Sequence, residues 1–224
     1  MARRLAELGF KSLRVDLSGI GDSRTLPDKQ NFRESAVADT RSTMAHVSGD
    51  ASARFVLFGL CSGADNALAA AAEDARVVGL ILIDAPAYVT RRAKLRTLFG
   101  RGLGHACWAG PRLLVRAVRS SVKKLRTSTR ATREIPQGRQ LPPQREYGAS
   151  LRCLVDRGVQ ILSIYSGALG DRYNAREQLF EVYPALRGRV DVAFFPAANH
   201  VFTELAQRQA LMSTVESWCR KWVD

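Results

Sequence analysis

The chain has 224 residues, of which 46% are hydrophobic and 25% charged, a composition typical of one globular domain with a sizeable buried core. No apolar run is long enough to span a bilayer, and the charged N-terminal residues are unlike a secretory signal, so we expect a cytoplasmic protein without an integral membrane span. The four cysteines are too far apart for a zinc site and do not resemble a disulfide framework, so we expect no metal and no cofactor.

Hydrophobic periodicity predicts helices that alternate with short buried strands. The N-terminus is expected to form a helix over 2–8 that Gly9 ends, then a strand over 11–17 and a glycine-rich turn over 17–23. Buried strands alternating with helices predict an α/β fold with a doubly wound, mostly parallel sheet. The remaining helices are expected at 32–47, 64–75 and 201–222, and the remaining strands at 54–58, 77–83, 159–165 and 190–195.

One interval, residues 88–146, interrupts this alternation. It contains a basic amphipathic helix candidate at 112–119 and proline-containing segments typical of loops at 135–138 and 141–144. We interpret the interval as a helical insertion, so the core domain consists of residues 1–87 and 147–224.

The insertion also carries the net charge of +13. Residues 91–145 hold fifteen Lys or Arg and one acid, Glu134, so the rest of the chain is close to neutral. Such a segment is either solvated and kept soluble by its arginines, or a surface that recognises an acyl carrier, coenzyme A, acidic glycans or anionic lipid headgroups. Aromatic residues are sparse there and no nucleic-acid-binding motif appears, which argues against a nucleic-acid partner.

The junction between a predicted strand and the following helix carries the candidate chemistry. Residues 59–63 have the pattern Gly-x-Cys-x-Gly, which places Cys61 on a sharp turn. Because the flanking backbone passes close to such a nucleophile, we expect only small residues to fit at Gly59 and Gly63. The helix N-terminus favours a thiolate on Cys61, and the backbone N–H of Ser62 would donate to an oxyanion. A buried thiol with only a packing role is the alternative interpretation of Cys61.

This pattern resembles the nucleophile elbow of the α/β-hydrolase superfamily, whose usual form is Gly-x-Ser-x-Gly. A minority of the family, dienelactone hydrolases among them, place cysteine there. Residues 16–23 are similar to the family's Asp-x-x-Gly-x-Gly-x-Ser turn. The resemblance covers almost the whole chain except the insertion, which lies where the family has its lid. Three strands and a loop that supplies the second oxyanion donor precede the first helix in the family, and the sequence shows no counterpart of them.

The family's chain order of nucleophile, acid and histidine implies the other members of a triad. His200 follows the last predicted strand and would take the proton of Cys61. Asp171, in the loop after the strand at 159–165, matches the usual position of the acid that orients the histidine. Asp84 is the alternative acid, because some α/β-hydrolases place it directly after the strand that ends here at residue 83.

The resemblance implies a hydrolase that cleaves an ester or thioester through a Cys-His-Asp triad and an acyl-enzyme intermediate, in the lidded esterase or serine-aminopeptidase-like branch. The expected partner is a small-molecule acyl substrate, either anionic or bound to a carrier that the basic insertion recognises. Two alternatives stay open. One is an acyltransferase or thioesterase acting on a carrier-bound acyl chain, and the other is a non-catalytic protein that retains the fold.

Overall fold

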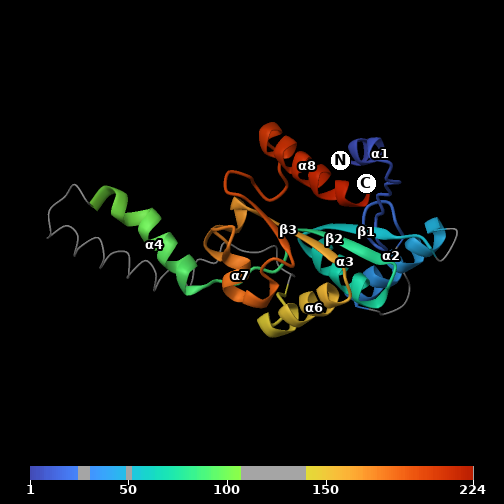
Figure 1. The fold of residues 1–224 in the computed structure, drawn as a ribbon, viewed down its shortest axis with the longest axis horizontal. Helices are drawn as coiled ribbons and strands as arrows, with labels where there is room; N and C mark the ends of the chain where they lie inside the picture. The colour runs from blue at the N-terminus through green and yellow to red at the C-terminus, as the bar shows by residue number, and fades with distance from the viewer. Residues whose placement is uncertain (25–30, 49–51, 107–139, 224) are drawn as a thin grey trace.

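The computed structural model of the protein describes residues 1–24, 31–48, 52–106 and 140–223 (Figure 1). Within these residues, four parallel strands form one sheet in the order β1-β2-β3-β4. Each strand pairs with the next one along the chain, and helices make the connections that parallel pairing requires. The strands are β1 (Phe55–Leu60), β2 (Val77–Ile83), β3 (Gln160–Ser166) and β4 (Asp191–Phe195).

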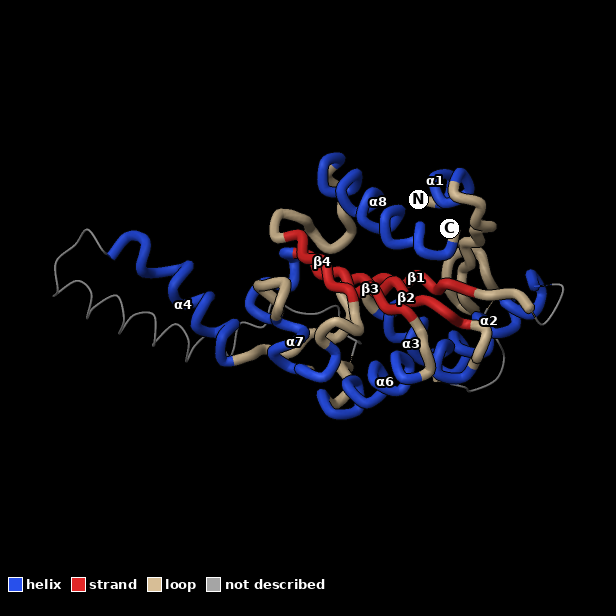
Figure 2. The backbone as a smooth tube through the Cα atoms, viewed as in Figure 1, coloured by secondary structure: helices blue, strands red, loops and turns tan. Residues whose placement is uncertain are grey.

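Helices cover both faces of the sheet, which confirms the predicted α/β class (Figure 2). One face carries α1 and α8, and the other carries α2, α3, α6 and α7. α4 starts beside this body and extends away from it (Figure 1). The helices are α1 (Ala2–Glu7), α2 (Phe32–Ser48), α3 (Ser62–Glu73), α4 (Arg91–Ala106), α6 (Gln144–Asp156), α7 (Gln178–Val182) and α8 (Leu205–Cys219), with short 3-10 helices η1 (Gly167–Arg172), η2 (Pro184–Leu186) and η3 (Arg220–Trp222).

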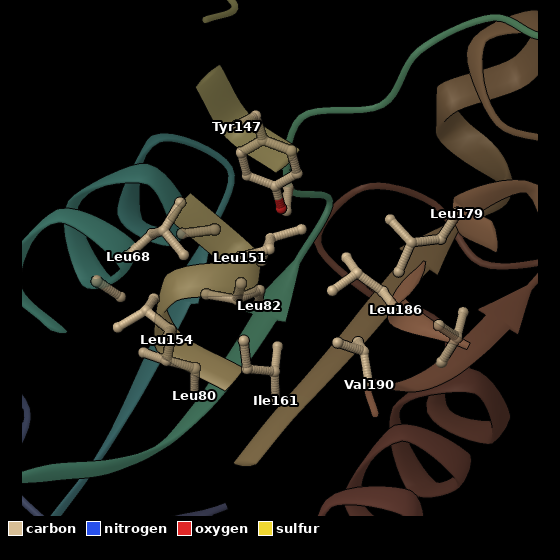
Figure 3. Packing of buried hydrophobic residues seen from close by; sticks show 14 of the residues in the cluster. Leu68, Leu80, Leu82, Tyr147, Leu151, Leu154, Ile161, Leu179, Leu186 and Val190 are labelled. Atoms are coloured by element: carbon tan, nitrogen blue, oxygen red, sulfur yellow. The ribbon is translucent and has the colours of Figure 1, made fainter. Parts of the chain in front are cut away.

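Two clusters of buried apolar side chains lie on opposite faces of the sheet. The larger one packs the sheet against α3 and α6, with Leu82 of β2 beside Leu151 and Tyr147 of α6 (Figure 3). The smaller one packs Ile81 and Ile164 against α8 and α1. β2 and β3 are therefore buried on both faces, which explains the continuous apolar sequence of β2. No helix in the described ranges is both long and apolar enough to cross a membrane.

Most of the predicted elements are confirmed. The N-terminal helix ends where Gly9 adopts a positive φ of 87°, and the strand expected at 77–83 has those bounds. The terminal helix starts later than expected, at Leu205 rather than 201. α6 was not predicted, although Tyr147, Leu151 and Leu154 follow the helical spacing that could have revealed it.

The strand predicted over 11–17 is wrong. These residues form no strand, and Leu13 is 61% exposed. A strand needs a neighbour that satisfies its backbone groups, and β1, at the edge of the described sheet, pairs there with β2 alone. The glycine-rich turn that follows is confirmed. Ser23 Oγ donates to the carbonyl of Asp16 at 2.7 Å, and Ser18 N donates to Asp39 Oδ2 at 2.7 Å.

Only the two ends of the predicted insertion can be compared with the structure. α4 occupies its beginning, and the loop at 141–143 and the start of α6 at Gln144 occupy its end. The helix predicted at 112–119 and the loop predicted at 135–138 lie outside the described residues, so the division into core and insertion stays a prediction. Tyr88 Oη donates to the carbonyl of Pro142 at 2.7 Å and joins the two ends.

Candidate active site

Cys61 lies on a strained turn between β1 and α3. Its φ of 58° and ψ of −118° are rare for a residue with a side chain. The turn is held on both sides, because Cys61 N donates to the carbonyl of Ile83 at 2.9 Å and Ala64 N donates to the carbonyl of Cys61 at 3.0 Å. The predicted strand–Cys–helix geometry is therefore present, with the cysteine at the carboxyl end of the sheet.

The two glycines that flank Cys61 differ in what they tolerate. A Cβ on Gly59 would lie 2.2 Å from the carbonyl oxygen of Gly63, so only glycine fits there. A Cβ on Gly63 would meet nothing within 4 Å, so the expected size limit at Gly63 is wrong. The physical reason is directional, since the backbone of Gly63 packs against Gly59 while its own Cβ direction is open.

Ser62 is the first residue of α3, and its side chain is exposed. The N–H groups of a helix's first turn have no acceptor within the helix, and they carry the positive end of its dipole. Ser62 directly follows Cys61, so the role of its N–H as a donor to an oxyanion stays a prediction.

Asp84 leaves β2 at the same edge of the sheet. Leu60 pairs with Ile83, so Cys61 and Asp84 follow neighbouring strands, which lie about 4.8 Å apart in a sheet. Asp84 has a positive φ of 47°, and its side chain is fully buried. Its N–H donates to the carbonyl of Ile164 at 2.8 Å, which ties the turn to β3 as well.

His200 pairs with Asp84. Its Nδ1 lies 2.7 Å from Asp84 Oδ2. An ionised carboxylate only accepts hydrogen bonds, so an ionised Asp84 requires the tautomer with the proton on Nδ1. The imidazole is 42% exposed while its carboxylate partner is fully buried. One edge of the ring is therefore accessible to a substrate, and the opposite edge is oriented by Asp84. Nε2 is then the nitrogen available for proton transfer.

The loop that carries His200 is itself fixed. Thr203 N donates to Asn199 Oδ1 at 3.1 Å, and Asn199 Nδ2 donates to Thr203 Oγ1. Phe202, with a positive φ of 52°, is buried and packs edge-on against Phe195 of β4, with 5.4 Å between ring centroids. These contacts hold the backbone on both sides of His200.

Asp171 does not occupy the position expected for the acid. It lies in η1 and accepts a hydrogen bond from Thr97 Oγ1 of α4 at 3.4 Å, whereas His200 bonds Asp84. The loop after β3 turns towards α4, so this carboxylate faces that helix. The structure thus corrects the expected partner of His200 from Asp171 to the alternative, Asp84.

Sequence reasoning missed Ser166, the last residue of β3. Its N–H donates to Asp84 Oδ1 and its Oγ donates to Asp84 Oδ2, each at 2.7 Å, and both residues are fully buried. The available signal was a polar residue at the carboxyl end of the strand next to β2, which Asp84 directly follows.

A polar network fastens the first half of α4 beside η1 and α7. Arg96 Nη1 lies 2.7 Å from Glu181 Oε1, and its Nε donates to Asn174 Oδ1 at 2.8 Å. Thr90 Oγ1 donates to Glu181 Oε2 at 2.5 Å. Burial raises the pKa of Glu181, but the hydrogen bonds from Arg96 and Thr90 outweigh it and leave the pKa below its usual value.

Comparison with known proteins supports the same architecture. No protein-family model and no curated protein matches the chain, but solved structures do. A protein of unknown function from Agrobacterium tumefaciens, described as a candidate α/β-hydrolase, is 14% identical with a TM-score of 0.55, and the match covers 99% of this chain and 74% of that one. A thermophilic esterase from Thermogutta terrifontis is 21% identical with a TM-score of 0.51, covering 92% of this chain and 78% of that one.

Proposed function

Because the chain has the α/β-hydrolase fold, we propose that it hydrolyses an ester or thioester, with Cys61 as nucleophile, His200 as general base and Asp84 as the acid that orients it. The observation that carries the proposal is the 2.7 Å pairing of His200 with a buried Asp84, at the sheet edge where Cys61 lies on a strained turn. Nucleophile, acid and histidine also follow the chain order of the superfamily.

The proposed reaction proceeds through an acyl-enzyme. His200 Nε2 takes the proton of Cys61, and the sulfur attacks the substrate carbonyl carbon while the carbonyl electron pair moves to oxygen. The Ser62 N–H stabilises that oxyanion. When the tetrahedral intermediate collapses, the bond to the alcohol or thiol breaks, and the leaving group takes its proton from His200. Water then gives a proton to His200 and attacks the thioester at Cys61, which releases the carboxylic acid and restores the thiol. Asp84 stays ionised throughout and stabilises the imidazolium.

A second candidate is acyl transfer from a carrier-bound substrate. The acyl-enzyme of a cysteine is itself a thioester, which remains reactive towards an amine or alcohol acceptor as well as water. The described start of α4 exposes Arg91, Arg92 and Lys94, which together favour an anionic carrier. In this proposal the basic insertion recognises the carrier. The triad of Cys61, His200 and Asp84 forms the acyl-enzyme as in hydrolysis.

Mass spectrometry of a trapped intermediate tests the proposal. The protein is incubated with a p-nitrophenyl ester and with an acyl-coenzyme A thioester, and the burst of released product and the mass of the chain are followed. We expect one acyl adduct on the peptide that contains Cys61, and loss of both burst and adduct in Cys61→Ala. Cys153→Ala is the matched control, because that thiol is exposed, and it should behave like the wild type.

The outcomes separate the candidates. Release of free acid from the adduct supports hydrolysis, and faster loss of the adduct when an amine or alcohol is added supports transfer. A burst that persists in Cys61→Ala would remove this residue from its role. A folded wild-type protein that forms no adduct with either substrate would refute both candidates in favour of a non-catalytic protein.

A further inference from the structure

We infer that Ser166 is a positioning residue for this triad, acting on Asp84 and through it on His200. The inference rests on the proposed function and extends it to a residue that does not touch the substrate. Ser166 would hold the carboxylate in the one orientation in which Oδ2 accepts the Nδ1–H of His200.

The contacts of the carboxylate lead to this inference. Ser166 N donates to Asp84 Oδ1 and Ser166 Oγ donates to Asp84 Oδ2, both at 2.7 Å, and His200 Nδ1 lies 2.7 Å from the same Oδ2. Both Asp84 and Ser166 have no exposed surface. A buried carboxylate is expensive unless donors satisfy it, and hydrogen bonds to a charged group are among the strongest in proteins. One serine supplies two of these donors, on two different oxygens.

The sheet explains why this serine can do so. Asp84 N donates to the carbonyl of Ile164, which is a bond of the parallel ladder between β2 and β3. The next donor of that ladder is the N–H of Ser166. Because Asp84 leaves the strand with a φ of 47°, its side chain accepts this N–H, and the hydroxyl of the same residue reaches the second oxygen. The geometry of β3 thus places both donors of Ser166 where they fix the orientation of the Asp84 carboxylate.

A comparison of two serines on the same strand tests the inference. Ser166→Ala removes the hydroxyl that donates to Asp84. Ser163→Ala is the matched control, because Ser163 is also fully buried and its Oγ has no hydrogen-bond partner within the described part of the chain. A hydrogen bond to a charged group changes an equilibrium or a rate by about 10- to 100-fold, so we expect kcat of Ser166→Ala to fall by up to that factor and Ser163→Ala to stay near wild type. Denaturant unfolding of both variants checks that each is folded.

A double-mutant cycle with Asp84→Asn separates positioning from a general loss of structure. If Ser166 acts through Asp84, Ser166→Ala should cost almost nothing further in the Asp84→Asn background. An equal loss in both backgrounds, or an equal loss in Ser163→Ala, would overturn the inference while leaving the triad intact. If Asp84→Asn itself keeps full activity, the proposed triad fails, and that result is distinct from the failure of Ser166 alone.

Discussion

The elbow that presents Cys61 makes an unequal prediction for its two glycines. In Gly59→Ala the new Cβ would lie 2.2 Å from the carbonyl oxygen of Gly63, 2.4 Å from its carbonyl carbon and 2.6 Å from the nitrogen of Ala64. All three atoms are backbone, so no side-chain rotation relieves the overlap. Real Cβ contacts essentially never fall below 3.0 Å, so the elbow must open by at least 0.8 Å.

Overpacking of a tight site costs about 1–3 kcal/mol and occasionally more. Since this overlap is with the backbone of the first turn of α3, we expect Gly59→Ala to lower the free energy of unfolding by about 3 kcal/mol or more. Gly63→Ala should act in the opposite direction. Its Cβ meets nothing within 4 Å, and alanine in place of glycine within a helix adds about 0.5–1 kcal/mol of stability.

Urea unfolding followed by circular dichroism measures both changes. Each variant is the control for the other, because both add one methyl group within the same turn, two residues on either side of Cys61. Equal destabilisation of the two variants would refute the reasoning, and so would a Gly59→Ala protein as stable as the wild type. The turnover of Gly59→Ala should fall as well, because opening the elbow displaces Cys61.

The acid and the α4 anchor give two further predictions. Asp84→Asn should lower turnover by about a thousandfold or more, because the amide no longer holds His200 in the tautomer with the proton on Nδ1. Asp171→Asn should change turnover by less than about threefold. A kinetic assay that gives the reverse order would restore Asp171 as the acid. Because the folded-state pKa of Glu181 is lowered, its contribution to stability is complete above about pH 4.5 and is lost as the pH falls through the folded value. Glu181→Gln should therefore lower the free energy of unfolding by about 1 kcal/mol at pH 7, a modest value because Arg96 is partly exposed. In urea unfolding the difference from wild type should shrink towards pH 3. A difference that stays constant with pH would contradict this prediction.

Much of the fold follows from local sequence patterns. β2 is a continuous apolar run because both of its faces are covered, and the glycines around Cys61 indicate the sharp turn between β1 and α3. The wrongly predicted strand at 11–17 shows the limit of such patterns. Its alternating residues permit a strand, but a strand also requires a paired neighbour, which periodicity within one segment does not report.

Local sequence patterns do not decide whether Asp84 or Asp171 pairs with His200. Both follow strands that end at the same sheet edge, so topology allows either to reach His200. What decides is the direction in which each carboxylate leaves its strand. Asp84 turns immediately at a positive φ and meets Ser166, whereas Asp171 lies several residues into η1, beside Thr97. Those directions depend on tertiary contacts that no local pattern contains.

The two carboxylates therefore divide two tasks between adjacent loops. The loop after β2 supplies the acid for His200, and the loop after β3 carries Asp171 and Asn174, which bond the start of α4. Ser166 lies at the boundary, since it belongs to the second loop's strand but bonds the first loop's acid. A change in the α4 anchor thus alters how α4 is held without removing the partner of His200. Under the proposed function, an insertion that selects the acyl substrate would be held independently of the triad that performs the chemistry.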